Sequence, residues 1–161
     1  MIKIYRYEIE NPSDKQGELH AQQSDAAKML IQKAAKELCG IDKAEIVRTE
    51  CGKPYFRDLP IKFSISHSKS RVVLALSDRE IGVDIQHISP RGTDVAKRFF
   101  TEDEVAYIGD DTVRFYEIWT KKEAYSKWQG KGLAENLDKS VLDLVFYTEN
   151  DGQYALAVYE K

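Results

Sequence analysis

Two charged side chains lie in the stretch of the sequence with the clearest capacity for chemistry. Glu123 and Lys127 fall in residues 119–133, which read WTKKEAYSKWQGKGL. On a helix, residues four apart share one face, and an exposed ion pair worth a few tenths of a kcal/mol is the simpler interpretation. Trp119, one turn earlier, favours a face that turns toward the core, where unpaired charge is costly. A carboxylate and an ammonium group in a cleft would suit a phosphate bridged by a metal ion.

A second acid lies inside an apolar segment, residues 82–86, which reads GVDIQ. Alternation along a strand places Asp84 and Gln86 on one face and the apolar residues on the other. A buried aspartate that accepts hydrogen bonds from backbone donors is the common structural explanation. Together with Glu123, however, Asp84 is a candidate Mg²⁺ ligand, because this ion takes one or two carboxylates and completes its shell with waters and substrate phosphate oxygens.

Hydroxyl and imidazole groups gather at the end of another expected strand. Residues 63–68 read FSISHS, so that His67 lies between Ser66 and a second serine. A G-x-S-x-G nucleophile elbow does not accompany them, so the pattern does not indicate a serine nucleophile. A simple turn would account for these residues, but donors at a strand end also suit a phosphate or nucleotide, to which a protonated His67 could donate. Lys53, just upstream, is by itself an ordinary surface lysine.

The elements that position these residues follow from the periodicity. We expect a strand over 2–9, a loop over 11–17, and a helix with Ser24 as its N-cap and Gly40 as its end. Short strands follow in what looks like a meander, and the second half has helices and then strands. The expected ranges are strands 46–49, 62–66, 72–76, 81–85, 141–147 and 154–159, and helices 95–108 and 112–129. This order predicts an α+β fold of two lobes, residues 1–80 and 81–161, that form one compact unit with a ligand cleft between them.

Composition limits the classes of function. The chain has 161 residues, 42% hydrophobic and 32% charged, as is typical of a folded globular protein. A net charge of −3 provides no overall field for nucleic acid, and the apolar runs fall short of the roughly 20 residues of a membrane helix. We therefore expect a cytoplasmic protein that binds neither nucleic acid nor a membrane. We also expect reduced thiols at Cys39 and Cys51. Any anion site must be local, and its candidates are Lys121, Lys122, Lys127, Lys131, Arg91, Lys97 and Arg98.

Taken in order, these segments resemble the successive motifs of the 4′-phosphopantetheinyl transferases, in the larger, pseudo-dimeric, surfactin-synthetase-activating type. The matching segments cover about half of the chain, at residues 52–54, 63–68, 82–86, 97–104 and 119–133. The resemblance implies two similar lobes related by a pseudo-twofold axis, with coenzyme A in the cleft between them. It also implies Mg²⁺-dependent transfer of 4′-phosphopantetheine from coenzyme A to a serine of an acyl or peptidyl carrier protein, with release of adenosine 3′,5′-bisphosphate.

The resemblance further implies roles at the reacting centre. Asp84 and Glu123 would bind Mg²⁺, and Lys127 would contact the phosphates of coenzyme A and act with Glu123 in catalysis. At Gln86 many relatives have a glutamate as a third ligand, and the amide would bind the metal directly or through a water. Glu104 matches an acidic position near the metal of the family, although Thr101-x-x-Glu104 is equally a capping box. The proton acceptor is either Glu123 or a metal-bound water.

Substrate contacts are implied in the same way. Lys53, Ser66 and His67 would contact the nucleotide end of coenzyme A, while the basic residues that the family has before its first long helix are not recognisable around residues 20–24. Because carrier proteins are acidic near their accepting serine, Lys97 and Arg98 are candidates for a docking face. The identity of the carrier protein is not set by these motifs.

Two alternatives to this interpretation stay open. A non-catalytic regulator that binds coenzyme A or a carrier protein could keep the same fold, and Gln86 and the absent basic residues are the features that favour it. The short trimeric synthases of the same superfamily are the second alternative. Because one chain here contains both expected lobes, we expect a monomer.

Overall fold

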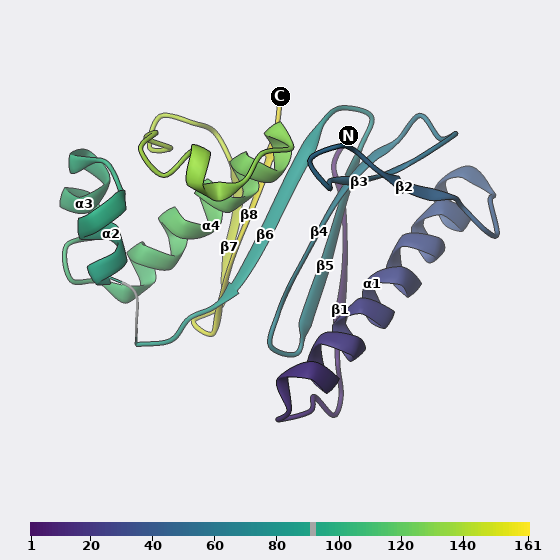
Figure 1. The fold of residues 1–161 in the computed structure, drawn as a ribbon, viewed down its shortest axis with the longest axis horizontal. Helices are drawn as coiled ribbons and strands as arrows, with labels where there is room; N and C mark the ends of the chain where they lie inside the picture. The colour runs from purple at the N-terminus through teal and green to yellow at the C-terminus, as the bar shows by residue number, and fades with distance from the viewer. Residues whose placement is uncertain (91–92) are drawn as a thin grey trace.

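The computed structural model of the chain describes residues 1–90 and 93–161 (Figure 1). Runs of antiparallel strands and runs of helices follow one another along it, so the α+β class is confirmed. The elements are β1 (Lys3–Glu8), α1 (Gln16–Cys39), β2 (Ile46–Arg48), β3 (Pro54–Phe56), β4 (Lys62–Ser68), β5 (Arg71–Ser77), β6 (Ile81–His87), α2 (Thr93–Phe99), α3 (Glu102–Ile108), α4 (Thr112–Gln129), the 3₁₀ turn η1 (Leu133–Glu135), β7 (Tyr147–Asn150) and β8 (Tyr154–Glu160).

Two antiparallel three-stranded sheets form the centre of the molecule. The N-terminal sheet has the order β1-β5-β4 and the C-terminal sheet has the order β6-β8-β7, while β2 and β3 form a separate ribbon. In both three-stranded sheets the first strand along the chain lies at one edge and the last lies in the middle. Figure 1 shows α1 outside the N-terminal sheet and α4 outside the C-terminal sheet, with the two sheets between them.

An apolar cluster joins the two sheets. Val73 and Ala75 of β5 pack with Val83 and Ile85 of β6, and all four are at most 3% exposed. Because side chains alternate along a strand, the other face of β5 turns toward α1. That face completes a second core with residues Val72, Leu74 and Leu76. β5 is therefore apolar on both faces, as a strand buried between two layers must be.

The first helix is longer than expected. It begins at Gln16, so the N-cap predicted at Ser24 is wrong and the loop predicted over 11–17 ends two residues earlier, at Lys15. The Gln22 side chain accepts a hydrogen bond from the Ser13 backbone N–H and donates one to the Asn11 carbonyl, each at 2.9 Å. These bonds hold the loop against the first turns of α1. Those turns are polar, so the apolar periodicity used for the prediction did not reveal them. The helix ends as predicted, before Gly40 in the left-handed region with φ of 70°.

Three further expectations are wrong. The helix predicted over 95–108 is two helices, because a capping box of Thr101 and Glu104 starts α3. Residues 141–146 are not a strand: Val141, Leu142, Leu144 and Phe146 pack irregularly against α4, Val145 is exposed, and β7 starts at Tyr147. The meander also stops early, since β6 pairs with β8 and not with β5. In addition, β3 was not predicted.

The expected chemical state of the two cysteines agrees with the structure, where Cys39 and Cys51 are both free thiols. Within residues 1–90 and 93–161, every helix is too short or too polar to cross a lipid bilayer.

Candidate functional site

Asp84 lies on β6 and is only 2% exposed. One carboxylate oxygen, Oδ1, accepts hydrogen bonds from Ser66 Oγ and Lys127 Nζ, each at 2.8 Å. The other oxygen, Oδ2, accepts one from Gln86 Nε2 at 2.9 Å. Three donors, one of them cationic, offset the water that the carboxylate loses on burial. Residues predicted from three separate segments therefore meet at Asp84.

Gly82 allows α4 to lie directly on β6. A Cβ atom at this position would stand 1.9 Å from the Ala124 carbonyl oxygen and 2.5 Å from the Trp128 backbone nitrogen. Because only glycine lacks that atom, the helix backbone can approach the strand closely. Glu123 and Lys127 lie on the same segment of α4, so this contact brings both of them toward Asp84, two residues along β6.

The Glu123 carboxylate is partly buried beside Asp84. In the part of the chain that the structure describes, it makes no hydrogen bond. Burial raises the pKa of Glu123, the negative charge of Asp84 raises it further, and the positive charge of Lys127 opposes both effects. The ion pair considered between Glu123 and Lys127 is not formed, because Lys127 pairs with Asp84 instead. Among residues 1–90 and 93–161, the Glu123 carboxylate thus has no hydrogen-bond or ion-pair partner, and it lies next to a second carboxylate, that of Asp84.

This donor set fits Mg²⁺. Two adjacent carboxylates repel each other, and a hard cation bound to their oxygens would remove that repulsion. The described residues contain no cluster of three or more His, Cys, Asp or Glu side chains placed to bind a metal. The remaining ligands would then be waters and phosphate oxygens, as Mg²⁺ commonly accepts. Gln86 points its amide nitrogen at Asp84, so its assignment as a third ligand stays a prediction.

Alternate serines of β4 join this strand to the free edge of β6. Their hydroxyl oxygens accept hydrogen bonds from backbone N–H groups of β6, at 3.0, 3.3 and 2.9 Å for the pairs Ser64–Val83, Ser66–Ile85 and Ser68–His87. The constant offset of 19 residues shows that the two strands run in parallel. Buried backbone N–H groups need acceptors. At this edge of β6 the serine hydroxyls accept the hydrogen bonds that the carbonyl groups of a paired strand would otherwise accept. The spacing of serines in FSISHS is the signal that could have indicated this role.

His67 lies at the surface of β4, with its ring centroid 5.9 Å from that of His20 on α1. Partial burial lowers the pKa of His67, and Lys127 and His20 lower it further, while Asp84 acts in the opposite direction. The ring is therefore neutral at pH 7 in the free protein, and a protonated donor would require the charge of a bound anion. The motifs did not single out His20, whose proximity to His67 comes from the packing of α1.

Lys53 is directed toward α4. Its Nζ lies 2.8 Å from Glu80 Oε2 and 3.1 Å from the Trp128 carbonyl oxygen, near the C-terminal end of the helix. It shares with Lys127 and Lys131 the lining of a hollow of about 260 Å³. Lys53 is thus near Lys127 and on a concave surface, but already paired with an acid.

Glu104 pairs with Lys122 at 2.8 Å, and both side chains are completely buried. Glu104 also accepts hydrogen bonds from the backbone N–H groups of Val141 and Thr101, at 2.9 and 3.2 Å. Lys122 donates to carbonyl oxygens of the segment after η1, including that of Leu137 at 2.9 Å. The capping box is therefore formed, and the hydrogen bonds and ion pair of Glu104 within the described residues go to Thr101, Val141 and Lys122; its place near the metal site stays a prediction.

The remaining basic candidates are distributed over the surface. Lys97 lies 3.5 Å from Asp110 and 53% of its side chain is exposed, while the Arg98 guanidinium lies 5.3 Å from the Phe99 ring centroid. Lys121 pairs with Glu117 at 2.8 Å. Arg91 lies outside the described residues. Of the members of the local cluster that the structure describes, Lys127 and Lys131 border the hollow next to the site.

Comparisons with known proteins agree with these features. A family model described as "4′-phosphopantetheinyl transferase superfamily" matches residues 80–161. A 4′-phosphopantetheinyl transferase of Bacillus subtilis is 41% identical over 118 residues, which cover 68% of this chain and 53% of that relative. The transferase gsp of Aneurinibacillus migulanus is 34% identical over 87% of this chain and 63% of its own length. Sfp of Bacillus subtilis strain 168 is 34% identical over 80% of this chain and 59% of its own length. The chain thus spans between half and two thirds of these relatives.

Proposed function

Because the chain belongs to the 4′-phosphopantetheinyl transferase superfamily, we propose that it transfers the phosphopantetheine arm of coenzyme A to a serine of an acyl or peptidyl carrier protein. The observation that carries this proposal is the meeting of Asp84, Glu123 and Lys127 where α4 crosses β6. The similar relatives are named 4′-phosphopantetheinyl transferases, which supports the phosphopantetheine group as the one transferred. Adenosine 3′,5′-bisphosphate would be the second product.

The proposed architecture is two lobes, residues 1–80 and 81–161, that form one compact unit with the site where they meet. The matching strand orders support it, because each half has a long helix outside a sheet with its last strand in the middle. The contact between Ser66 of the first half and Asp84 of the second also supports it. Cytoplasmic location and a monomeric state stay predictions from the sequence.

In the proposed reaction the carrier serine oxygen forms a bond to the phosphorus that bears pantetheine. The bond from that phosphorus to the bridging oxygen breaks, and adenosine 3′,5′-bisphosphate leaves with its electron pair. Mg²⁺ bound by Asp84 and Glu123 would neutralise charge on the phosphoryl oxygens. Lys127 supplies a fixed positive charge at the same place. The proposed acceptor of the serine proton is either the Glu123 carboxylate, which lies at the same place, or a water bound to the metal ion.

Substrate binding uses the surface around Lys127. Ser66 and His67 approach it from β4, and Lys53 borders the same hollow from the other side. Because Lys53 is already paired with Glu80, we propose that its contact with the nucleotide requires a change of partner. Lys97 and Arg98 are retained as the proposed docking face for an acidic carrier protein.

The test is to incubate the purified protein with coenzyme A, Mg²⁺ and a panel of apo carrier proteins, and to measure their intact masses. We expect one phosphopantetheine group on at least one carrier, and its loss with Asp84→Ala. Lys127→Ala should lower kcat/KM by about 100-fold, as removal of one charge-stabilising group typically does. Lys28→Ala, at an exposed ion pair on α1, is the matched control. Binding of coenzyme A without transfer to any carrier would contradict the proposal and favour a non-catalytic regulator.

A further inference from the structure

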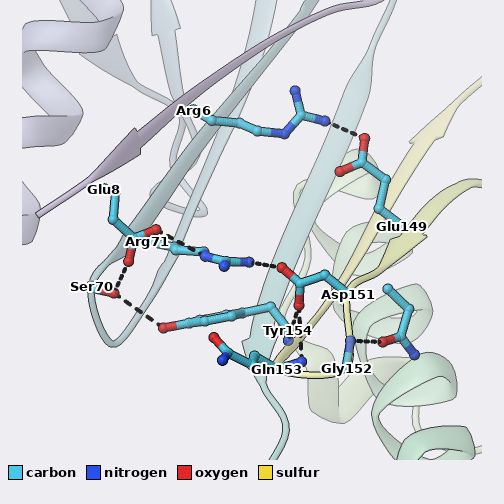
Figure 2. A network of polar contacts seen from close by, with 10 residues as sticks. Arg6, Glu8, Ser70, Arg71, Glu149, Asp151, Gly152, Gln153 and Tyr154 are labelled. Carbon is cyan, nitrogen blue, oxygen red and sulfur yellow. Dashed lines mark hydrogen bonds and ion pairs between the residues drawn. The ribbon is translucent and has the colours of Figure 1, made fainter.

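Arg71, at the tip of the β4–β5 hairpin, contacts both sheets. Its Nε lies 3.0 Å from Glu8 Oε2 on β1, in the same sheet, and its Nη1 pairs with Asp151, which follows β7 in the other sheet (Figure 2). Its guanidinium also lies 4.0 Å from the ring centroid of Tyr154, at the start of β8. The planar fork of arginine can make these contacts at once, whereas a lysine has a single nitrogen.

Hydrogen bonds from the backbone hold the Asp151 side chain in place independently of Arg71. Its Oδ1 accepts hydrogen bonds from the backbone N–H groups of Gln153 and Tyr154, at 3.0 and 2.8 Å, which define the turn between β7 and β8. Arg71 and these backbone donors lower the pKa of Asp151 to about 2. A second bridge, between Arg6 of β1 and Glu149 of β7, lies beside it in Figure 2.

A closed ring of contacts connects Arg71 to the edge of β6. Arg71 is the register partner of Ser68 in the hairpin. Ser68 accepts the hydrogen bond from the His87 backbone N–H at 2.9 Å. The His87 ring packs edge-on against Tyr154, with centroids 5.1 Å apart. Tyr154 in turn lies under the Arg71 guanidinium. The ring therefore ties β4 to the end of β6.

The position of β4 along β6 decides whether the site is assembled. Ser66 lies two residues before Ser68 and donates to Asp84 at 2.8 Å. Opening of the hairpin tip would first release Ser68 from His87 and then Ser66 from Asp84. We propose that Arg71 is a positioning residue, which acts through this ring to hold Ser66 against Asp84. The effect on turnover rests on the proposed function, but the effect on the contact between the strands does not.

A cavity behind the ring supports this assignment. It has a volume of about 580 Å³, and its lining includes Arg6, Arg71, Ile85, Tyr154 and Leu156. Close apolar packing would fix the separation of two sheets by itself. Here the hollow borders the apolar cluster between the sheets, so at this end the polar bridges at its rim act together with the apolar packing to set the distance between the sheets.

The direct test is amide hydrogen exchange, followed by NMR, in Arg71→Met. The His87 N–H should exchange about fivefold faster than in the wild type, a factor in the range of a strong, partly exposed ion pair. The Ile85 N–H should show a smaller increase, and the Val83 N–H, at the far end of the serine contacts, should not change. Arg57→Met is the matched control, because Arg57 pairs with Glu45 at 2.8 Å within the first half of the chain.

Equal exchange at His87 in the two variants would overturn the proposal. A uniform increase at all three amides would also overturn it, because that pattern indicates general destabilisation. The second readout is transfer kinetics at a temperature well below Tm. Arg71→Met should lower kcat/KM about fivefold, Arg71→Lys should fall between it and the wild type, and Arg57→Met should match the wild type. If neither the wild type nor any variant transfers phosphopantetheine, the proposed function is wrong. The hydrogen-exchange experiment still decides the role of Arg71 in that case.

Discussion

At the scale of single residues, Glu123 illustrates a conflict between stability and activity. Its pKa in the folded protein is raised above the ordinary value of 4.5 by burial and by Asp84. The folded state therefore binds this proton more tightly than the unfolded chain does. Stability from this group falls as the pH rises from 4.5 through the folded-state pKa, and the full penalty remains above it. The site accepts this penalty because the same carboxylate is available to a cation.

Replacing Glu123 with glutamine should therefore stabilise the free protein while abolishing transfer. We expect Glu123→Gln to raise Tm at neutral pH, and this gain to disappear below pH 4.5, where the carboxyl is protonated in both states. Added Mg²⁺ should raise Tm in the wild type and not in the variant. Thermal unfolding followed by circular dichroism measures all three effects. Glu50→Gln, at an exposed position, should leave Tm unchanged, and a lower Tm in Glu123→Gln at neutral pH would contradict the argument.

The sequence predicted the acids of the site better than their partners. Alternation along one strand correctly placed Asp84 and Gln86 on the same face. It did not show that Lys127 pairs with Asp84 and not with Glu123, because that choice depends on how α4 crosses β6. Nor did it show that His67 is neutral, since its pKa depends on neighbours from α1 and α4. Local spacing in the sequence shows which residues share a face of a strand. It does not show which side chains from different elements become partners.

At the scale of elements, the close approach of α4 to β6 depends on Gly82, which has no Cβ atom. We expect Gly82→Ala to lower the free energy of unfolding by about 3 kcal/mol, because the added Cβ would overlap the helix backbone. Transfer should fall as well, since Glu123 and Lys127 would move with the helix. Urea unfolding measures the first effect and the carrier-mass assay the second.

The control for this substitution is a glycine with free space. Gly17 lies in the first turn of α1, and no atom of the described residues would lie within 4 Å of an added Cβ, apart from its own helix and chain neighbours. Gly17→Ala should be neutral or stabilising by up to about 1 kcal/mol. Equal stability of Gly82→Ala and Gly17→Ala would show that the helix can shift without cost.

The buried pair of Glu104 and Lys122 attaches α4 to α3 and to the segment after η1. Lys122→Met should lower the free energy of unfolding by about 3–5 kcal/mol, because it leaves the Glu104 carboxylate buried without its cation. The double variant Glu104→Gln with Lys122→Met should recover part of this loss. Lys121→Met, at a more exposed pair with Glu117, should cost at most about 1 kcal/mol. Similar losses in the two single variants, measured by urea unfolding, would refute this role.

Element boundaries were predictable where the residues themselves supply the signal. Gly40 ends α1 because its φ of 70° suits glycine, and the expected ranges of α4 and β8 agree with the structure. Residues 141–146 look like a strand because most of them are apolar, yet Val141, Leu142, Leu144 and Phe146 fill the space beside α4 and the segment has no pairing partner among the described strands. Apolar content reports burial, whereas strand formation also requires a neighbouring edge that the sequence does not show.

At the scale of the whole molecule, the two halves complete each other. The cluster between the sheets takes Val73 and Ala75 from the first half and Val83, Ile85 and Leu156 from the second. Separation of the halves would expose these side chains to water, and the buried N–H groups of β6 would lose the serine hydroxyls that accept their hydrogen bonds. Each half alone is also near the size at which a single core becomes marginal.

We therefore expect the full chain to unfold in one cooperative transition, with equal calorimetric and van't Hoff enthalpies. Fragments 1–80 and 81–161 should each lack a cooperative transition when expressed alone, because each leaves one face of a sheet uncovered. Differential scanning calorimetry of the chain and of both fragments tests this. Two resolved transitions, or a fragment that unfolds cooperatively, would mean that the halves are independent domains, and the site would then depend on their docking. A single transition would mean that folding itself brings Ser66 and Asp84 together.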